Sequence, residues 1–361
     1  MKKIAYIELD THAEIALNFM ELMNDSKEFS VDYYFSEKIL SSFGFTQDDN
    51  LPENIKKVTP ENILSKLAVT LSLSKSLQSK YDLIVIGTVH RYFNVFEKIA
   101  EKYNTAVICH NLNFVKTSKW DLLKALYKED FKYRLKLLLK EGLLRKSEVY
   151  QKAKHLLVLD ETMAKDKYKN LPVFYTKFST QSTNEVLTIV IPGAVSQKRR
   201  DYERVLKTIT FFKFPLKIVF LGKAQGKELE MLQGFDKLSL TNIKIKYFTK
   251  KVSQSEFDEY MQQADVLWCP IQPETEFFSQ KEIYGTTKMS GNIGDAIKFS
   301  KLAVFPSAYG GIHNFIAPEM FLLEKGLEIK NYRELTNERF TEFSKDKILA
   351  KLEKSLKQMT S

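Results

Sequence analysis

Short, continuously apolar runs alternate along this chain with segments in which apolar residues recur every three or four positions. The first half contains the runs KIAYIEL, YDLIVIG and TAVIC, which begin at residues 3, 81 and 105. Because both faces of such a run are apolar, each is typical of a parallel strand that is covered on both sides. Apolar residues follow the first run at helical spacing, and these are Ile15, Phe19, Leu22 and Met23. The pattern therefore predicts a strand, a loop and a helix.

The same alternation continues through the chain. In the first half we expect strands at 3–9, 31–35, 81–90, 105–112 and 155–161. Helices are expected there at 15–23, 63–77 and 93–103, with a polar connection at 41–58. In the second half we expect strands at 186–193, 216–222, 243–248, 265–271 and 302–307. Helices are expected there at 200–211, 227–233, 253–264 and 345–358. Ser253 and Glu256 form a capping box at the start of the third of these.

Length and the polar stretch STQSTNE at 179–185 divide the chain. A chain of 361 residues is too long for one ordinary core, and the stretch is typical of a linker. Strands that alternate with helices predict parallel α/β sheets, whose ligands bind beyond the carboxyl ends of the strands. The sequence therefore predicts an α/β protein with two doubly wound, Rossmann-like domains at 1–180 and 185–330, followed by C-terminal helices at 331–361.

The stretch YGTTKMSGNIGDAIKFSKLAVFP, residues 284–306, is the strongest candidate for a ligand site. A loop rich in Thr, Ser and Gly, which contains Lys288, leads through Gly291 and Gly294 into a short helical pattern at 295–299. A helix N-terminus offers unpaired N–H groups and a positive dipole end, which suit a diphosphate. Asp295 can accept hydrogen bonds from sugar hydroxyls and favours the helix start. The alternative is that Gly and Ser only turn a strand into a helix.

A second candidate site follows the run VLTIVIPG. Gly193 ends that run, and Lys198, Arg199 and Arg200 precede the next predicted helix. Positive charge at a helix start opposes the helix dipole, so a bound anion would explain it better than an exposed basic surface does.

Two open α/β sheets in tandem resemble the GT-B fold, and residues 185–307 resemble nucleotide-sugar glycosyltransferases of family 4; the likeness is weaker over 1–161. In that family a glycine after the domain's first strand and a basic pair contact the donor diphosphate. Gly193 matches the glycine, and Lys198 with Arg199 or Arg200 matches the pair. ADVLWCPI, at 264–271, is similar to the strand that leads to the donor loop. The resemblance also implies that the last helix packs back on the first domain.

The family carries two acids around the donor loop, the first contacting the donor sugar and the second the ribose. Asp295 matches the second acid, but Thr287 stands near the place of the first. Glu282 is close enough in sequence to substitute for it. The departure leaves as expected donor contacts Lys288, Ser290 and Gly291.

Three histidines follow predicted strands in the first half. His110 matches a family histidine near the transferred sugar, where a neutral imidazole can donate a hydrogen bond. His12 follows the first strand and can act as a base or bind the acceptor, so we expect both histidines at the catalytic centre. For His90 the simpler interpretation is that it caps its strand. Glu8 and Asp10 are alternative acceptor contacts. The other interpretation of Glu8 is a satisfied polar group in the strand.

The formal net charge of +10 is concentrated in one segment. Residues 116–154 hold twelve Lys or Arg against five Asp or Glu, with leucines and aromatic residues among them. A helix with lysines beside an apolar face can bind an anionic membrane surface, or it can pack on its domain and expose the lysines to water. Nucleic acid is not expected, because no nucleic-acid-binding signature accompanies the charge.

Composition adds three expectations. Cys109 and Cys269 stand far apart in apolar runs, which is typical of buried thiols in a reducing cytoplasm rather than of a disulfide framework or a zinc site. No apolar stretch is long enough for a membrane span, so a cytoplasmic protein is expected, either free or peripheral on the inner face of the cell membrane. No metal and no cofactor beyond the nucleotide sugar as co-substrate are expected, since the chain contains no Asp-x-Asp metal motif.

The sequence thus predicts a metal-independent glycosyltransferase of the hexosyltransferase type. It would transfer a sugar from a nucleotide diphosphate sugar to a carbohydrate or lipid-linked acceptor, in surface polysaccharide synthesis. Two alternatives stay open. One is a catalytically silent binding module of the same fold, favoured by the missing first acid. The other is a sugar-nucleotide epimerase or hydrolase, which would need carboxylates and histidines around the sugar.

Overall fold

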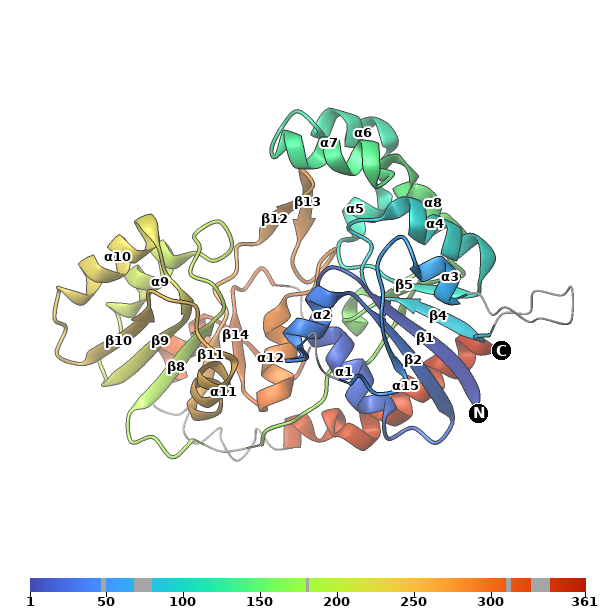
Figure 1. The fold of residues 1–361 in the computed structure, drawn as a ribbon. Helices are drawn as coiled ribbons and strands as arrows, with labels where there is room; N and C mark the ends of the chain where they lie inside the picture. Colours follow the sequence, from blue (N-terminus) through green and yellow to red (C-terminus); the bar gives the residue numbers. More distant parts are fainter. Residues whose placement is uncertain (47–49, 68–79, 180–181, 310–312, 326–337) are drawn as a thin grey trace, which may run out of the picture. The chain divides into compact units, whose positions relative to one another are not determined.

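The computed structural model describes residues 1–46, 50–67, 80–179, 182–309, 313–325 and 338–361. The chain divides into two compact units, each built around its own parallel sheet (Figure 1). Unit 1 comprises 1–173, 276–282 and 346–361, and unit 2 comprises 174–275 and 283–345. The first boundary therefore falls at 173/174, some residues before the expected linker.

Unit 1 contains a seven-stranded sheet in the order β3-β2-β1-β4-β5-β6-β7. Its strands are β1 Lys2–Glu8, β2 Phe29–Phe35, β3 Ile55–Lys57, β4 Leu83–Ile86, β5 Thr105–Ile108, β6 His155–Val158 and β7 Tyr168–Asn170. All neighbouring pairs are parallel. Every residue of β4 and β5 is buried, which explains why these strands are apolar except for Thr105.

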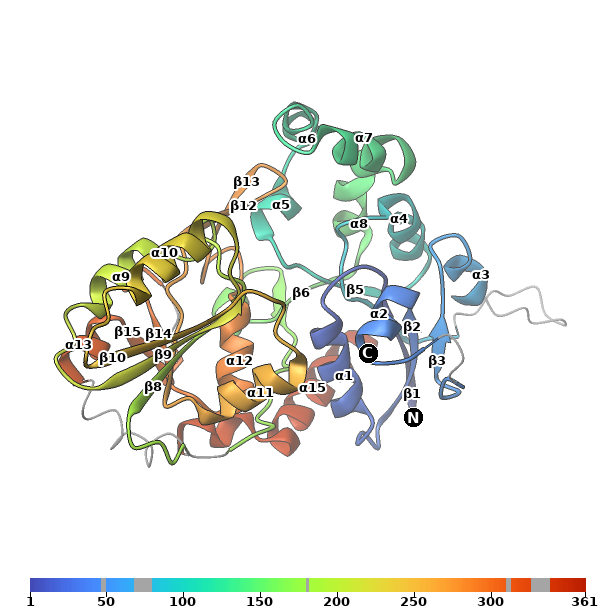
Figure 2. The same cartoon turned by 60° about the vertical axis from the view of Figure 1, so that its left-hand side comes forward.

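Figure 2 shows the helices of unit 1. They are α1 Ala13–Met23, α2 Glu37–Ser42, α3 Ile63–Leu67, α4 Phe93–Lys102, α5 Leu112–Lys116, α6 Lys119–Ala125, α7 Phe131–Lys140, α8 Lys146–Lys152 and most of α15 Lys345–Thr360. Short 3-10 turns lie at Leu143–Arg145 and Glu161–Met163.

Unit 2 contains a six-stranded sheet in the order β10-β9-β8-β11-β14-β15. Its strands are β8 Leu187–Pro192, β9 Leu216–Lys223, β10 Ile243–Phe248, β11 Val266–Trp268, β14 Ala303–Phe305 and β15 Ile316–Pro318. Its helices are α9 Tyr202–Ile209, α10 Gly226–Asp236, α11 Gln254–Gln263, α12 Gly291–Phe299 and α13 Met320–Lys325, with a 3-10 turn at Thr341–Phe343. Ile189 and Ile191 join one core cluster while Val190, between them, joins another, so both faces of the sheet are buried.

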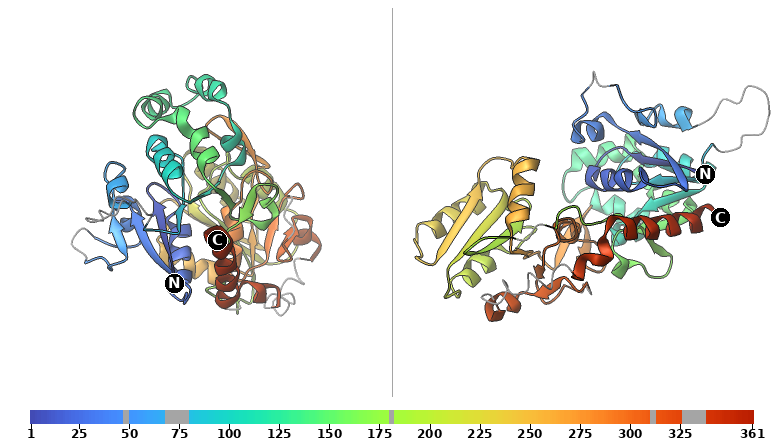
Figure 3. Two further views of the ribbon diagram at one scale, coloured as in Figure 1. Left: turned by 90° about the vertical axis from the view of Figure 1, so that its right-hand side faces the viewer. Right: turned by 90° about the horizontal axis from the view of Figure 1, so that it is seen from below.

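Two segments distant in sequence complete unit 1. One is most of the hairpin of β12 Glu274–Phe277 and β13 Gln280–Ile283, which belongs to unit 1 from Glu276 to Glu282. The other is α15, whose apolar stripe is buried and consists of Ile348, Leu352, Leu356 and Met359. Lys2 Nζ donates to the Thr360 carbonyl at 2.8 Å, so both ends of the chain lie in this unit (Figure 3).

The two doubly wound sheets confirm the predicted fold class, but several expected elements differ. The expected connection at 41–58 contains the end of α2 and the strand β3. The strand β3 is too short to give a recognisable pattern in the sequence. β7, β15, α13 and the hairpin of β12 and β13 were not expected. The helix expected at 63–77 is described only to Leu67, and its remainder lies outside the described residues.

The basic segment at 116–154 contains the end of α5, the helices α6, α7 and α8, and a 3-10 turn. Lys146 is fully buried and donates to the carbonyls of Phe114, Val115 and Thr117 at 2.5, 3.1 and 2.8 Å. Burial lowers the pKa of Lys146 to about 8. Part of the positive charge therefore holds the end of α5.

Candidate functional site

The strand orders place the two candidate sites. In each sheet the strand order reverses direction at one point. This switch point lies between β1 and β4 in unit 1 and between β8 and β11 in unit 2. Ligands of doubly wound sheets bind beyond the strands' carboxyl ends at such a switch point. Gly193 follows β8, while His12, His90 and His110 follow β1, β4 and β5.

Gly193 has a backbone conformation that favours glycine, with φ at +100°. A Cβ at this position would come within 2.5 Å of Arg200 Nη2. The Arg200 guanidinium therefore lies against the backbone that follows β8, and its Nη1 donates to the Ala194 carbonyl at 3.2 Å. Glycine at 193 leaves room for this cation at the end of the strand.

A polar chain leads from Arg200 to the helix α12. Arg200 Nη2 donates to Asn292 Oδ1 at 3.3 Å, and Asn292 Nδ2 donates to Asp295 Oδ2 at 3.1 Å. Arg200 Nε is buried and has no hydrogen-bond partner within the described part of the chain. A half-buried guanidinium with an unsatisfied N–H is suited to bind an oxyanion.

Helix α12 begins at Gly291, four residues earlier than expected. Ser290 is its N-cap, is buried, and accepts a hydrogen bond from the Asn292 N–H at 3.4 Å. Asp295 consequently lies in the second turn of α12. The expectation that its carboxylate favours the helix start is therefore wrong, because the first turn is formed by the residues that precede it, Asn292 among them. Its place beside Asn292 is set by helical spacing.

The loop before α12 is a tight turn around one carbonyl. The Ile283 carbonyl accepts from the N–H groups of Thr286, Thr287 and Lys288 at 3.1, 2.9 and 3.2 Å. Thr287 Oγ1 accepts from the Ile283 N–H at 2.8 Å. The threonine in the place of the first acid therefore fixes the turn. Lys288 Nζ lies 5.8 Å from the centre of the Tyr284 ring.

Lys198 and Arg199 are both exposed. Lys198 lines a shallow, open pocket together with Gln197, Gln272, Pro273 and Glu274. The Arg199 carbonyl accepts from the Gln272 N–H at 2.9 Å. Of the three basic residues, Arg200 is the one that lies against Gly193. The sequence had left open whether Arg199 or Arg200 is the second member of the basic pair.

Glu282, considered as a substitute for the first acid, is engaged elsewhere. Its carboxylate is fully buried in unit 1 and accepts from the N–H groups of Phe114 at 2.8 Å and Asn113 at 3.3 Å. These are the first orphan donors of α5. Glu282 is therefore an N-terminal cap for α5, and the substitution idea is wrong.

In unit 1 the parallel register brings the three histidines together. The rings of His12 and His110 are stacked with centroids 4.0 Å apart, and His90 lies 5.8 Å from His110 and 6.2 Å from His12. His12 has a left-handed backbone conformation, with φ at 60°, immediately before α1. His90 also packs against the Phe277 ring at 4.4 Å. His90 is thus part of the cluster as well as a residue at its strand end.

Hydrogen bonds orient these rings. His110 Nε2 donates to the Gly87 carbonyl at 2.8 Å. Asn111 Nδ2 donates to His90 Nε2 at 3.3 Å, a contact that needs a neutral imidazole with an acceptor nitrogen. His12 Nδ1 pairs with Glu14 Oε1 at 3.1 Å. His12 therefore has the carboxylate partner that orients a general base.

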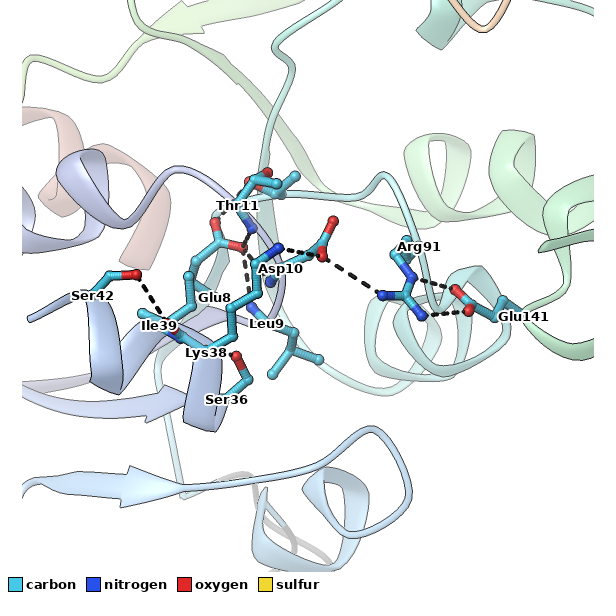
Figure 4. Close-up of polar contacts among 11 residues, drawn as sticks. Glu8, Leu9, Asp10, Thr11, Ser36, Lys38, Ile39, Ser42, Arg91 and Glu141 are labelled. Atoms are coloured by element: carbon cyan, nitrogen blue, oxygen red, sulfur yellow. Dashed lines mark hydrogen bonds and ion pairs between the residues drawn. The ribbon is translucent and has the colours of Figure 1, made fainter. Parts of the chain in front are cut away.

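Glu8 is buried at the end of β1, and Figure 4 shows its contacts with the residues that follow it. Its Oε1 accepts from the N–H groups of Leu9, Asp10 and Thr11 at 3.0, 3.1 and 3.3 Å, and its Oε2 accepts from Thr88 Oγ1 at 2.7 Å. Burial raises the pKa of Glu8 to about 7, against the opposing effect of these hydrogen bonds. Of the two roles considered for Glu8, the structure shows the satisfied polar group.

Two features around Glu8 were not recognised in the sequence. A Cβ at Gly87 would come within 2.5 Å of Glu8 Oε2, so glycine makes room for the carboxylate. Thr88 links that carboxylate to His110, whose Nε2 lies 3.4 Å from Thr88 Oγ1. The signal was the sequence GTVH directly after a buried strand. Asn292 carried no comparable signal.

Asp10 is held by two cations (Figure 4). Its Oδ1 lies 3.2 Å from Lys38 Nζ and 3.7 Å from Arg91 Nη1. Arg91 also donates to both carboxylate oxygens of Glu141 at 3.0 and 2.7 Å. This network anchors the loop between β1 and α1, which carries His12.

Other features bear on the chemistry. Within the described ranges, no cluster of three or more His, Cys, Asp or Glu could hold a metal ion. Cys109 and Cys269 are buried free thiols whose pKa values burial raises, that of Cys109 to about 12. Across the same residues, no helix is both long and apolar enough to cross a bilayer.

No protein-family model and no curated protein match the chain. Solved structures do. The Anabaena protein HepE, in complex with UDP and glucose, superposes with a TM-score of 0.56 at 11% identity over 99% of this chain and 100% of its own. The lipopolysaccharide outer core galactosyltransferase WaaB gives 0.55 at 10% identity over 99% of both chains. The N-terminal domain of a Candida albicans trehalose-6-phosphate phosphatase gives 0.57 at 9% identity over 100% of this chain and 97% of its own. At such identities the likeness shows the GT-B fold alone.

Proposed function

We propose that this protein is a glycosyltransferase that moves a sugar from a nucleotide diphosphate sugar to a carbohydrate or lipid-linked acceptor. The observation that carries the proposal is the Arg200 guanidinium, which lies on Gly193 with a buried, unsatisfied Nε and is hydrogen-bonded to Asn292 in the first turn of α12. Backbone N–H groups and a fixed cation together are suited to a diphosphate.

The diphosphate would be bound by the backbone of Gly193 and Gly291, the Ser290 cap, and cations from this unit. The cations assigned are Arg200, Lys198, Arg199 and Lys288. When the bond between the sugar and the diphosphate breaks, negative charge grows on the departing diphosphate, and preorganised cations stabilise it. The Asp295 carboxylate would accept hydrogen bonds from the ribose hydroxyls. Binding through cations and N–H groups requires no metal.

The sugar and the acceptor would be bound by His110 and His12. With the Nδ1 proton of His12 held by Glu14, its Nε2 is the nitrogen that accepts a proton from an acceptor hydroxyl. His110, whose ring is stacked on His12, would assist binding. Glu8 and Thr88 act behind these rings as positioning groups, because their hydrogen bonds fix the turn that carries His12 and the loop that holds His110.

The finer assignment follows from the matched residues and the neighbours. HepE was solved with UDP and UDP-glucose, so we propose a hexosyltransferase of the family 4 type and UDP as the first nucleotide to test. WaaB, a lipopolysaccharide galactosyltransferase, supports an acceptor in surface polysaccharide synthesis. Such an acceptor would place the enzyme in the cytoplasm, at the inner face of the membrane.

Nucleotide binding tests the donor site. We expect one of UDP, GDP, ADP or CMP to raise the melting temperature selectively, because a ligand that binds only the folded state stabilises it. Lys198→Ala and Lys288→Ala should each lower the affinity for that nucleotide about tenfold, which is the loss expected for one charged hydrogen bond. Lys227→Ala, at an exposed position in α10, is the matched control. Unchanged affinity in both site variants would overturn the assignment.

Turnover tests the histidines separately. His110→Ala should lower the rate of sugar transfer more than the affinity for the diphosphate, and the reverse result would remove His110 from the site. Thr287, whose hydroxyl fixes the turn, supports a second candidate, a silent binding module. Tight nucleotide binding without transfer or hydrolysis would favour that module, and loss of the nucleotide sugar without an acceptor would favour an epimerase or hydrolase.

A further inference from the structure

Helices α6 and α7, with the turn between them, carry several exposed apolar side chains. Five aromatic side chains are exposed among the described residues, and Trp120, Tyr127 and Phe131 are three of them. Leu139 is exposed as well. Trp120, Tyr127 and Leu139 are 74%, 80% and 73% exposed, far more than a packed helix would leave in water. We call Trp120, Tyr127, Phe131 and Leu139 the apolar outer patch.

The inner side of the same helices is fully engaged. Arg134 is buried, and its Nη1 donates to the Ala125 carbonyl and, at 2.8 Å, to Ser279 Oγ in the hairpin of β12 and β13. The Phe278 ring lies 4.9 Å from the same guanidinium. Figures 1 and 2 both show α6 and α7 side by side, away from the parallel strands of unit 1. The apolar outer patch is therefore not needed to hold the helices to the protein.

Positive charge surrounds the apolar outer patch. From Lys116 to Lys140, seven lysines are exposed against three exposed acidic residues. Lys132, Lys136 and Leu139 follow one another at spacings of four and three, which places them on one face of α7. Aromatic rings and lysines on one surface match a membrane interface, where the rings lie among headgroups and the lysines meet anionic lipid.

We propose that α6 and α7 form a docking surface for an anionic lipid bilayer. Charge complementarity selects this occupant over a protein partner, because seven exposed lysines stand against three exposed acidic residues, and Lys119 alone of these lysines pairs with an acid outside that stretch, Glu148, within the described residues. The surface does not depend on the proposed transfer reaction, so it can be tested in the absence of any substrate. Its consequence for the enzyme would be a supply of acceptor from the bilayer surface.

The two tryptophans allow a direct measurement. Trp120 is 74% exposed on the apolar outer patch, whereas Trp268 is fully buried and its Nε1 donates to Glu319 at 2.9 Å. Vesicles of phosphatidylcholine with phosphatidylglycerol should shift the emission of the full-length protein to shorter wavelength, and brominated lipids should quench it. Trp120→Phe should retain vesicle binding but lose both signals, which would assign them to this side chain.

Flotation of the protein with the same vesicles tests the charge. Each lysine near an anionic surface strengthens binding about fivefold, so Lys132→Gln with Lys136→Gln should weaken it about 25-fold. The matched control is Lys227→Gln with Lys237→Gln, two exposed lysines in unit 2. Phe131→Ser should also weaken binding, and Phe211→Ser, at an exposed aromatic residue in unit 2, should not.

Three outcomes would overturn the proposal. One is the absence of binding to anionic vesicles. Another is equal loss in the Lys132, Lys136 variant and in its control. The third is an equal emission shift with a soluble polyanion such as heparin, which would identify a polyanion surface instead. Because the altered side chains are exposed, circular dichroism and melting temperature should stay unchanged in all variants.

Discussion

Replacement of Glu8 by glutamine should stabilise the protein at neutral pH and leave it nearly unchanged in mild acid. The side chain is nearly isosteric, its Oε1 can still accept the three N–H groups of residues 9–11, and its amide can donate to Thr88 Oγ1. What changes is the charge. In the folded protein the buried carboxyl has a pKa of about 7, against an ordinary value of 4.5.

The sign follows from proton binding. Between pH 4.5 and 7 the folded state holds a proton on Glu8 that the unfolded state has lost, so this group's contribution to stability is present below pH 4.5 and is lost as the pH rises through 7. A displacement from 4.5 to about 7 corresponds to about 3 kcal/mol at about 1.4 kcal/mol per pH unit. The gain from Glu8→Gln should therefore grow by about 3 kcal/mol between pH 4.5 and pH 8.

Hydrogen exchange of peptides that cover β1 gives the free energy of opening of this part of unit 1. The measured quantity is the difference between Glu8→Gln and the parent protein at each pH, which cancels the titration of all other groups. Glu97→Gln is the matched control, because its pairs with Arg145 and Lys152 lower the pKa of Glu97. That variant should be destabilised by a constant amount above pH 5. A difference for Glu8→Gln that does not change with pH would refute the reasoning.

Two further substitutions test packing. Gly294→Ala would bring its Cβ to 2.7 Å from the Phe174 ring and should lower the free energy of unfolding by about 1–3 kcal/mol. Gly234→Ala, at a helical glycine with open space around it, should raise the free energy of unfolding by about 0.5–1 kcal/mol. Urea denaturation measures both values, and equal effects of the two substitutions would contradict the packing described for Gly294. Glu282→Ala would leave the N–H groups of Asn113 and Phe114 without their acceptor, so hydrogen exchange of α5 should accelerate about tenfold or more, and unchanged protection would show that the cap is unimportant.

The fold could be predicted because its strands are buried on both faces. Residues 83–86 are apolar throughout and residues 187–192 are apolar except for Thr188, a pattern typical of a parallel sheet covered by helices. Short or half-exposed elements gave no such signal. In β12, every second residue of 274–277 is exposed. The hairpin that β12 forms with β13 is held by contacts with residues that are distant in the sequence.

The candidate sites were predictable where side chains follow strands directly. The three histidines and Gly193 all lie at strand ends, and parallel register alone brings such positions together. The choice of Arg200 over Arg199 depended on which side chain reaches Gly193, and the role of Glu282 depended on the docking of the hairpin against α5. Neither is a property of local sequence.

The composition of unit 1 from three separated segments has a consequence for synthesis of the chain on the ribosome. The strands β1 to β7 emerge first, but the helix whose apolar stripe they bury, α15, is translated only after all of unit 2. All of unit 2 is therefore translated while unit 1 still exposes the apolar surface that α15 covers. The domain translated first cannot be completed first, and a chain truncated before residue 346 should bind chaperones through that surface.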